Sequence, residues 1–199
     1  MIYPVPPLIL ASQSPRRQFL LNAAGFPFTV QSADVPEVLP PGMPAADAPA
    51  YLSRIKAEPV ARQFPDSLVI GADTVVVLAG ELIGKPKDLA EAERILNRLS
   101  GATHTVISGV TFLYGERTHT FTETTEVRFR KLAAVEIAHY LNIQPPLDKA
   151  GAYGIQDFIG LIGVEYIQGD YYNIMGLPVC RLVQELQAFL PKPPVATNF

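Results

Sequence analysis

A continuous apolar run, Leu8–Ala11, leads through a short polar turn into a stretch of helical length. Four consecutive apolar residues are typical of a strand buried on both faces, because a strand with one solvated face alternates apolar and polar residues. The turn ends in Ser14 and Pro15, which together indicate a helix start. Serine is a common N-cap, and proline is tolerated at the first helical position because its missing N–H would have no partner there. This segment therefore predicts a strand, a tight turn and a helix over Arg16–Ala24.

Further segments of strand length and helix length alternate along the rest of the chain. We expect strands over residues 26–31, 68–78, 81–84, 105–114, 118–129 and 164–168, and helices over residues 51–64, 88–99, 133–141 and 178–190. Pro59 is expected to kink or end its helix, because proline removes a backbone hydrogen bond. Residues 144–163 are expected to form a glycine-rich loop, and Gly169-Asp170 the turn of a hairpin between strands at 164–168 and 171–174. Helices interleaved with a sheet of parallel and antiparallel pairs indicate an α/β fold.

Composition narrows the class of protein. The chain has 199 residues, of which 48% are apolar and 18% charged, and we expect one domain over residues 1–190 followed by a Pro-rich tail at 191–199. A formal charge of -3 argues against a general nucleic-acid-binding protein, since that affinity comes mainly from Lys and Arg neutralising phosphates. No apolar run reaches the roughly 18 residues of a membrane helix, and Met1–Pro7 lacks the basic residues of a secretory signal. Cys180 is the only cysteine and is expected in the core. We expect a cytoplasmic protein that binds neither nucleic acid nor membranes.

The turn over Ser12–Arg17 combines a helix N-terminus, two hydroxyls and two adjacent guanidinium groups. This combination suits a polyphosphate, because the helix dipole favours anions and arginine presents paired donors that match phosphate oxygens. The same residues would also form an ordinary N-cap followed by two solvated arginines. Local pattern alone leaves both interpretations open.

Asp73 is a lone carboxylate inside the apolar stretch Leu68–Leu78. A buried charge is costly without a partner or a metal ion, so a functional carboxylate is one explanation and a strand-end turn is the other. Lys56, Lys85 and Glu37 taken singly are typical of solvated surface.

The segment Lys149–Gln156 offers an aromatic ring at Tyr153 and an amide at Gln156 beside flexible glycines. Such a loop suits the edge of a nucleotide base, although an ordinary connection has the same composition. The three histidines have no metal-ligand spacing, and His104 is expected to be structural.

The order of these motifs resembles the Maf family of nucleoside triphosphate pyrophosphatases over about residues 8–190. The matching segments are Ser12–Arg17, Leu20-Leu21, Gly25-Phe26, Glu37, Lys56-Ala57, Gly71–Val76, Gly84–Pro86, Leu99–Gly101, His104–Val106 and Lys149–Gln156. The resemblance implies a mixed, strongly twisted sheet flanked by helices, with two lobes around a cleft. Two departures from the family pattern are a thinned acidic cluster before Glu37 and the presence of Pro59 after Lys56-Ala57.

The branch of the family that this chain is similar to implies hydrolysis of dTTP and UTP to a nucleoside monophosphate and pyrophosphate. By this resemblance the triphosphate is held by Ser12, Ser14, Arg16, Arg17, Lys56 and Lys85, and base selection involves Arg16, Thr74 and Gln156. Asp73 is the expected catalytic residue, and Asp73 and Glu37 are the expected ligands of a divalent metal, Mg²⁺ or Mn²⁺. The division of roles between these two carboxylates stays open.

The resemblance also implies a homodimer. Two alternative functions are a 7-methyl-GTP pyrophosphatase and a nucleotide-binding inhibitor of cell division that lacks turnover.

Overall fold

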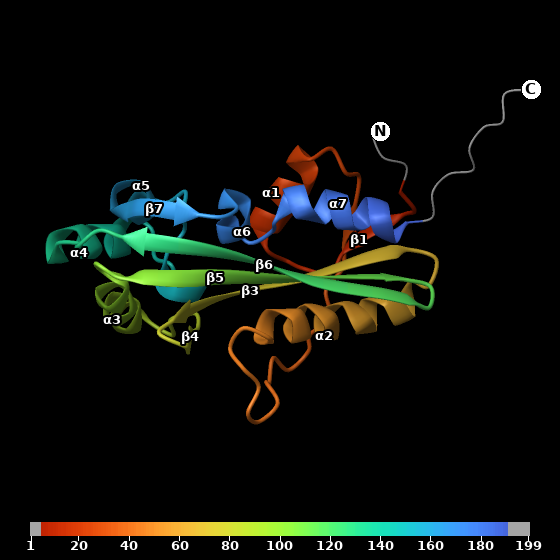
Figure 1. The fold of residues 1–199 in the computed structure, drawn as a ribbon, viewed down its shortest axis with the longest axis horizontal. Coiled ribbons are helices and arrows are strands. Elements are labelled where there is room, and N and C mark those ends of the chain that lie inside the picture. The colour runs from red at the N-terminus through yellow and green to blue at the C-terminus, as the bar shows by residue number, and fades with distance from the viewer. Residues whose placement is uncertain (1–4, 191–199) are drawn as a thin grey trace, which may run out of the picture.

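The computed structural model describes residues 5–190, which build one seven-stranded sheet (Figure 1). The strands are β1 (Leu8–Leu10), β2 (Thr29–Val30), β3 (Leu68–Leu78), β4 (Glu81–Ile83), β5 (Thr103–Tyr114), β6 (Arg117–Phe129) and β7 (Val164–Gln168). The order is β2-β1-β3-β5-β6-β7, with β4 also paired to β3. β1 runs parallel to both of its neighbours, whereas the other pairs are antiparallel. The mixed α/β sheet predicted from the sequence is confirmed.

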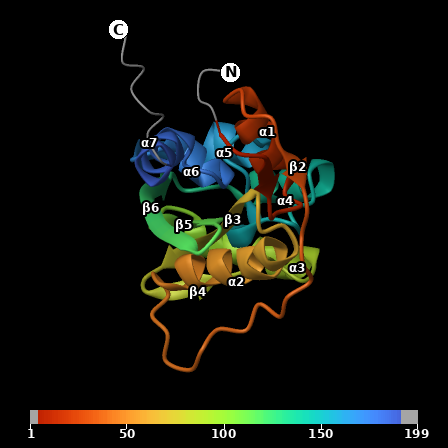
Figure 2. The same ribbon diagram turned by 90° about the vertical axis from the view of Figure 1, so that its right-hand side faces the viewer.

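Helices cover both faces of this twisted sheet (Figures 1 and 2). They are α1 (Pro15–Ala23), α2 (Ala48–Gln63), α3 (Leu89–Leu99), α4 (Ala134–Ile143), α5 (Phe158–Gly163), α6 (Tyr171–Met175) and α7 (Val179–Phe189), with a 3₁₀ turn, η1 (Ala150–Ala152). α2 and α3 lie on one side, and α1, α6 and α7 lie on the other (Figures 1 and 2). The apolar run in β1 is buried as expected, because it lies between these layers. No helix within residues 5–190 has the length and apolar character needed to cross a membrane.

The long strand β3 connects two hydrophobic cores. Leu68 and Ile70 pack with residues of α1 and α7 in one core, whereas Val76 packs with residues of α3 and α4 in the other. Asp73 and Thr74 lie on β3 between these two groups. The polar pair therefore lies between the two hydrophobic cores.

The expected hairpin around Gly169-Asp170 is wrong. Residues 171–175 form helix α6, because the Asp170 side chain accepts a hydrogen bond from Tyr172 N at 2.7 Å and so caps a helix instead of a turn. The expected loop 144–163 is also only partly correct, since it contains η1 and α5.

Three smaller expectations are corrected by packing. Helix α2 continues through Pro59 to Gln63, because its neighbours Ala57 and Val60 are buried against the sheet and hold the helix there. The strand expected over residues 26–31 is limited to β2. Cys180 is exposed, not in the core, because it lies on the outer side of α7. The Pro-rich tail expected at 191–199 lies outside the described residues.

Candidate functional site

A pocket of about 620 Å³ opens where β3 has an unpaired edge. β1 pairs with Leu68–Ile70 and β4 with Val76–Leu78, and both must use the same edge because β5 occupies the other. Between them, residues 71–75 have no strand partner on that edge in the described part of the chain. The turn after β1 and the loop after β4 both line this gap. Side chains from both faces of the sheet can thus reach one pocket.

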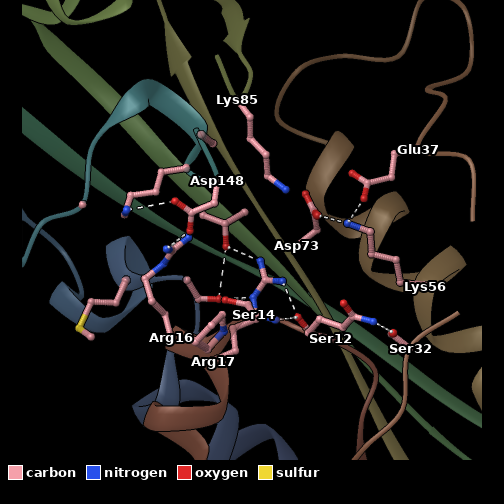
Figure 3. Close-up of a pocket in the computed structure, with 18 of the residues that line it drawn as sticks. Ser12, Ser14, Arg16, Arg17, Ser32, Glu37, Lys56, Asp73, Lys85 and Asp148 are labelled. Carbon is pink, nitrogen blue, oxygen red and sulfur yellow. Dashed lines mark hydrogen bonds and ion pairs between the residues drawn. The ribbon is translucent and has the colours of Figure 1, made fainter. Parts of the chain in front are cut away.

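All ten site residues expected from the family resemblance line this pocket, and Figure 3 labels all of them except Thr74 and Gln156. They are Ser12, Ser14, Arg16, Arg17, Glu37, Lys56, Asp73, Thr74, Lys85 and Gln156. They come from α1 and the turn before it, the loop after β2, α2, β3, and the loops after β4 and η1. These ten include four cationic side chains and two carboxylates, and Lys149, Asp34 and Asp148 add one cation and two carboxylates to the same lining.

The buried carboxylate of Asp73 is paired with Lys56 from α2 (Figure 3). Lys56 Nζ lies 2.5 Å from Asp73 Oδ1 and 2.8 Å from Glu37 Oε1. The Asp73 side chain is 11% exposed, whereas that of Glu37 is 50% exposed. Lys85 extends from the opposite side toward Asp73. The lysine offsets the cost of burying Asp73 and joins the two carboxylates.

The two carboxylates also determine what metal this site suits. Within residues 5–190 there is no cluster of three or more His, Cys, Asp or Glu side chains that could enclose an ion. Mg²⁺ is commonly bound by one or two carboxylates together with substrate phosphates and water. Asp73 and Glu37 fit a metal of this kind.

Arg17 is fixed by three hydrogen bonds. Its Nε donates to Gly176 O at 2.9 Å, its Nη1 to Ser12 Oγ at 3.0 Å and its Nη2 to Thr74 Oγ1 at 3.2 Å. A guanidinium has five N–H donors, so two remain for a ligand. Burial lowers the pKa of Arg17, and the charge of Asp73 partly opposes this effect. The group stays protonated, because an arginine does not lose its proton in a protein.

Arg16 is joined to a residue that the sequence did not single out. Arg16 Nη1 lies 2.7 Å from Asp148 Oδ2, and Asp148 also contacts Lys149. Partial burial alone would raise the pKa of the Asp148 carboxyl, but hydrogen bonds from Arg16 and Lys149 lower it below its ordinary value. The only sequence signal was the position of Asp148 directly before the motif Lys149–Gln156. This ion pair connects the helix turn with the loop on the far side of the pocket.

The start of α1 leaves a hydroxyl available to a ligand. Ser14 occupies the N-cap position as predicted, but its side chain makes no capping hydrogen bond. Ser12 is buried, and its Oγ contacts both Ser14 N at 3.3 Å and Arg17. The helix N-terminus and the Ser14 hydroxyl therefore border the pocket together.

Gln156 and Tyr153 have different surroundings although they are neighbours. Gln156 is exposed on the pocket wall, whereas Tyr153 is 5% exposed. Tyr153 Oη lies 2.8 Å from His104 Nε2, so the phenol is bonded to the core and not to the cavity. Burial lowers the pKa of His104 to about 4 and keeps the ring neutral at pH 7. His104 is thus a buried structural residue, as expected from the sequence.

The sequence model of the family described as Maf-like protein matches residues 7–189. The chain belongs to the Maf-like family. This Maf-like protein is 47% identical over 180 residues to a dTTP/UTP pyrophosphatase of Cytophaga hutchinsonii, with 90% of this chain and 83% of the relative covered. It is 49% identical over 181 residues to a dTTP/UTP pyrophosphatase of Bacillus cytotoxicus, with 91% and 94% covered. A third dTTP/UTP pyrophosphatase, from Bacillus pumilus, is 45% identical over 182 residues, with 92% and 96% covered.

Proposed function

We propose that this protein hydrolyses dTTP and UTP to the nucleoside monophosphate and pyrophosphate. The observation that carries the proposal is the gathering of four cationic side chains and a buried carboxylate in one pocket. The names of the Maf-like relatives support the same substrates. The fold brings these groups together from segments distant in sequence.

The triphosphate chain is held by Arg16, Arg17, Lys56 and Lys85. These cations face the roughly four negative charges of a nucleoside triphosphate, and charge neutralisation stabilises the transition state of phosphoryl chemistry. Arg17 offers its two unused N–H donors, which suits the paired oxygens of a phosphate. The start of α1 adds the Ser14 hydroxyl and a favourable helix dipole.

Asp73 accepts the proton of the attacking water. The water oxygen bonds to the α-phosphorus, the bond from that phosphorus to the oxygen bridging to the β-phosphate breaks, and pyrophosphate leaves. We assign the general base to Asp73 and not to Glu37 because the Asp73 side chain is more deeply buried. A phosphate beside Lys56 Nζ would share that ammonium and leave Asp73 Oδ1 free to accept a proton.

Mg²⁺ bound by Asp73 and Glu37 would neutralise phosphate charge and orient the phosphates. Lys56 contacts both carboxylates and so keeps them close together without a metal. The chain itself thereby maintains the arrangement of the two ligands.

Thr74 and Gln156 restrict which nucleotide base the pocket accepts. The Gln156 amide offers one donor side and one acceptor side, which can pair with the alternating acceptor and donor groups of uracil or thymine. Thr74 is small and neutral, so it adds no charge to pair with the cationic 7-methylguanine. By family resemblance we also propose a homodimer that acts in the cytoplasm.

The test identifies the products. The purified protein is incubated with Mg²⁺ and UTP, and phosphorus NMR distinguishes UMP plus pyrophosphate from UDP plus phosphate. We expect the first pair. UDP and phosphate as the primary products would contradict cleavage between the α- and β-phosphates, and the absence of any product would favour a binding protein without turnover.

A further inference from the structure

Behind the pocket wall lie two buried polar residues that the proposed reaction does not use. Ser108 is on β5 directly opposite Thr74 of β3, and Asn173 is in α6. Both are 0% exposed. Polar side chains at such positions are unusual unless their hydrogen bonds serve a purpose.

Ser108 is hydrogen-bonded to the residue that holds Arg17. Ser108 Oγ lies 2.8 Å from Thr74 Oγ1, which in turn lies 3.2 Å from Arg17 Nη2. A guanidinium only donates, so the Thr74 hydroxyl must accept from Arg17. Its own proton then goes either to Ser108 Oγ or to Gly176 O at 3.3 Å. In the first arrangement Ser108 accepts from Thr74 and can donate its own proton to Asn173 O, whereas in the second Ser108 donates to Thr74 Oγ1. Each arrangement fixes the rotation of the Thr74 hydroxyl, so that a lone pair faces Arg17.

Asn173 ties helix α6 to the sheet. Its Nδ2 donates to Val106 O at 3.1 Å and to Thr125 Oγ1 at 3.0 Å. Its backbone oxygen lies 3.3 Å from Ser108 Oγ and accepts the Ser108 proton when Thr74 donates to Ser108. At the end of α6, Gly176 O accepts from Arg17 Nε. The anchor at Asn173 therefore places the carbonyl that holds the other side of the guanidinium.

One atom of Asn173 argues against a purely stabilising role. Its Oδ1 is buried and has no hydrogen-bond partner in residues 5–190. An unpaired buried acceptor destabilises a folded protein and offsets part of what the two Nδ2 hydrogen bonds contribute. Sites that break such a rule are often kept for function.

We propose that Ser108 and Asn173 are positioning residues for the triphosphate. They hold Thr74 and the Gly176 carbonyl, so that Arg17 presents its two remaining N–H groups to the phosphates. The inference rests on the proposed function only in taking Arg17 as a phosphate ligand.

The test is a double-mutant cycle of Ser108→Ala and Thr74→Val, measured as kcat/KM for UTP. Each single variant should lose about tenfold, as expected for one hydrogen bond that positions a charged group. Because Ser108 acts through Thr74, the double variant should also lose about tenfold. A loss near hundredfold would show independent effects and overturn the proposal.

Thr111→Val is the matched control. Thr111 is on the same strand and is equally buried, but its hydroxyl bonds to Ser53 Oγ and Thr120 Oγ1, outside the pocket. We expect it to change kcat/KM less than twofold. A Ser108→Ala variant that behaves like this control would return Ser108 to an ordinary core role.

Asn173→Leu tests the second residue at a temperature where circular dichroism shows the variant folded. We expect a loss of about tenfold in kcat/KM, in line with the displacement of one charge-assisted contact. An unchanged value would overturn the role of Asn173.

A binding measurement separates this inference from the proposed function. Calorimetry with inorganic tripolyphosphate should give a Kd about tenfold higher for Ser108→Ala and an unchanged Kd for Thr111→Val. If the wild type hydrolyses neither dTTP nor UTP, the proposed function fails, and the two Kd values alone decide the inference. A wild type that hydrolyses UTP but does not bind tripolyphosphate would overturn the inference and leave the proposed function standing.

Discussion

At the scale of single residues, Asp73 combines burial with a charge. Lys56 lies 2.5 Å away, which makes that burial tolerable, and the next residue, Thr74, faces the opposite side of β3 toward Arg17. Adjacent residues of one strand point to opposite faces. The two functions proposed for the pocket, water activation and phosphate binding, thus involve two neighbouring positions.

Asp73→Asn should lower kcat for UTP by about 10²–10⁴-fold, since the amide cannot act as a general base. The fold should persist because Lys56 retains Glu37 as a partner. Pyrophosphate release and thermal unfolding are measured together, with Asp66→Asn as the control, because Asp66 is an exposed carboxylate outside the pocket. An Asn variant with near-parental turnover would make Asp73 a structural residue.

Arg16→Ala and Lys85→Ala should each lower kcat/KM by about 10- to 100-fold, because each removes a charge-assisted contact with phosphate. Their melting temperatures should stay near that of the parent, since exposed ion pairs contribute little to stability. Arg128→Ala is the control: it breaks the exposed pair with Glu165, outside the pocket, and should leave kinetics unchanged. Unaltered kinetics with a large loss of melting temperature would contradict phosphate binding by Arg16 and Lys85.

Gln156→Glu should reduce the preference for UTP over ATP, because the amide donor becomes a second acceptor. The measurement is the ratio of the two kcat/KM values for parent and variant. Equal ratios would remove Gln156 from base recognition.

At the scale of elements, His104 links β5 to the loop that carries Gln156. Its ring bonds to Tyr153 and packs against Phe129 with ring centroids 5.5 Å apart. The loop is therefore attached to a core that holds a neutral imidazole.

Burial lowers the pKa of His104 from 6.5 to about 4. As the pH falls from 6.5 toward 4, this histidine is therefore protonated in the unfolded chain but still neutral in the folded protein. The stabilisation from a neutral His104 is complete above pH 6.5 and is lost as the pH falls to about 4, a difference of ~3 kcal/mol. Urea unfolding at pH 7 and pH 4.5 should show a smaller decrease for His104→Gln than for the parent. The control is the same substitution at the exposed His139. A His104→Gln protein with the parental pH dependence would refute the assignment of this pH dependence to His104.

Gly71 allows α2 to pack close to β3. A Cβ at this position would lie 2.2 Å from Ser53 O and 2.8 Å from Ala57 Cβ. Gly71→Ala should therefore destabilise the protein by up to about 3 kcal/mol and lower its Tm by roughly 6 to 12 °C. Gly84→Ala meets no atom within 4 Å and should change Tm little, so equal Tm values for the two variants would contradict the packing explanation.

At the scale of the whole molecule, local patterns predicted most elements but not how they meet. The apolar runs of β1 and β3 and the N-cap at Ser14 are encoded in short segments, and they form where expected. Helix α6 was missed because the Asp170 side chain, not the nearby glycine, determines the local hydrogen bonds.

The pocket required more than local pattern. The ten candidate residues could be found from the resemblance to the Maf family, but the gap along β3 between β1 and β4 follows from strand pairing over long distances in sequence. The same reason explains why the sequence analysis missed Asp148, Ser108 and Asn173. Their hydrogen-bond partners lie 132, 34 and 67 residues away, and the contacts of Asn173 form only when α6 packs on the sheet. Tertiary contacts of this kind leave no periodic signal in one sequence.

The most direct measurement is pyrophosphate release from dTTP, UTP, ATP, GTP and 7-methyl-GTP by the purified protein with Mg²⁺. We expect the specificity constants for dTTP and UTP to exceed the other three, because a polar site discriminates strongly when the wrong base leaves its groups unpaired. A preference for 7-methyl-GTP would contradict the assigned substrates, and no pyrophosphate from any of the five would contradict the enzymatic function itself.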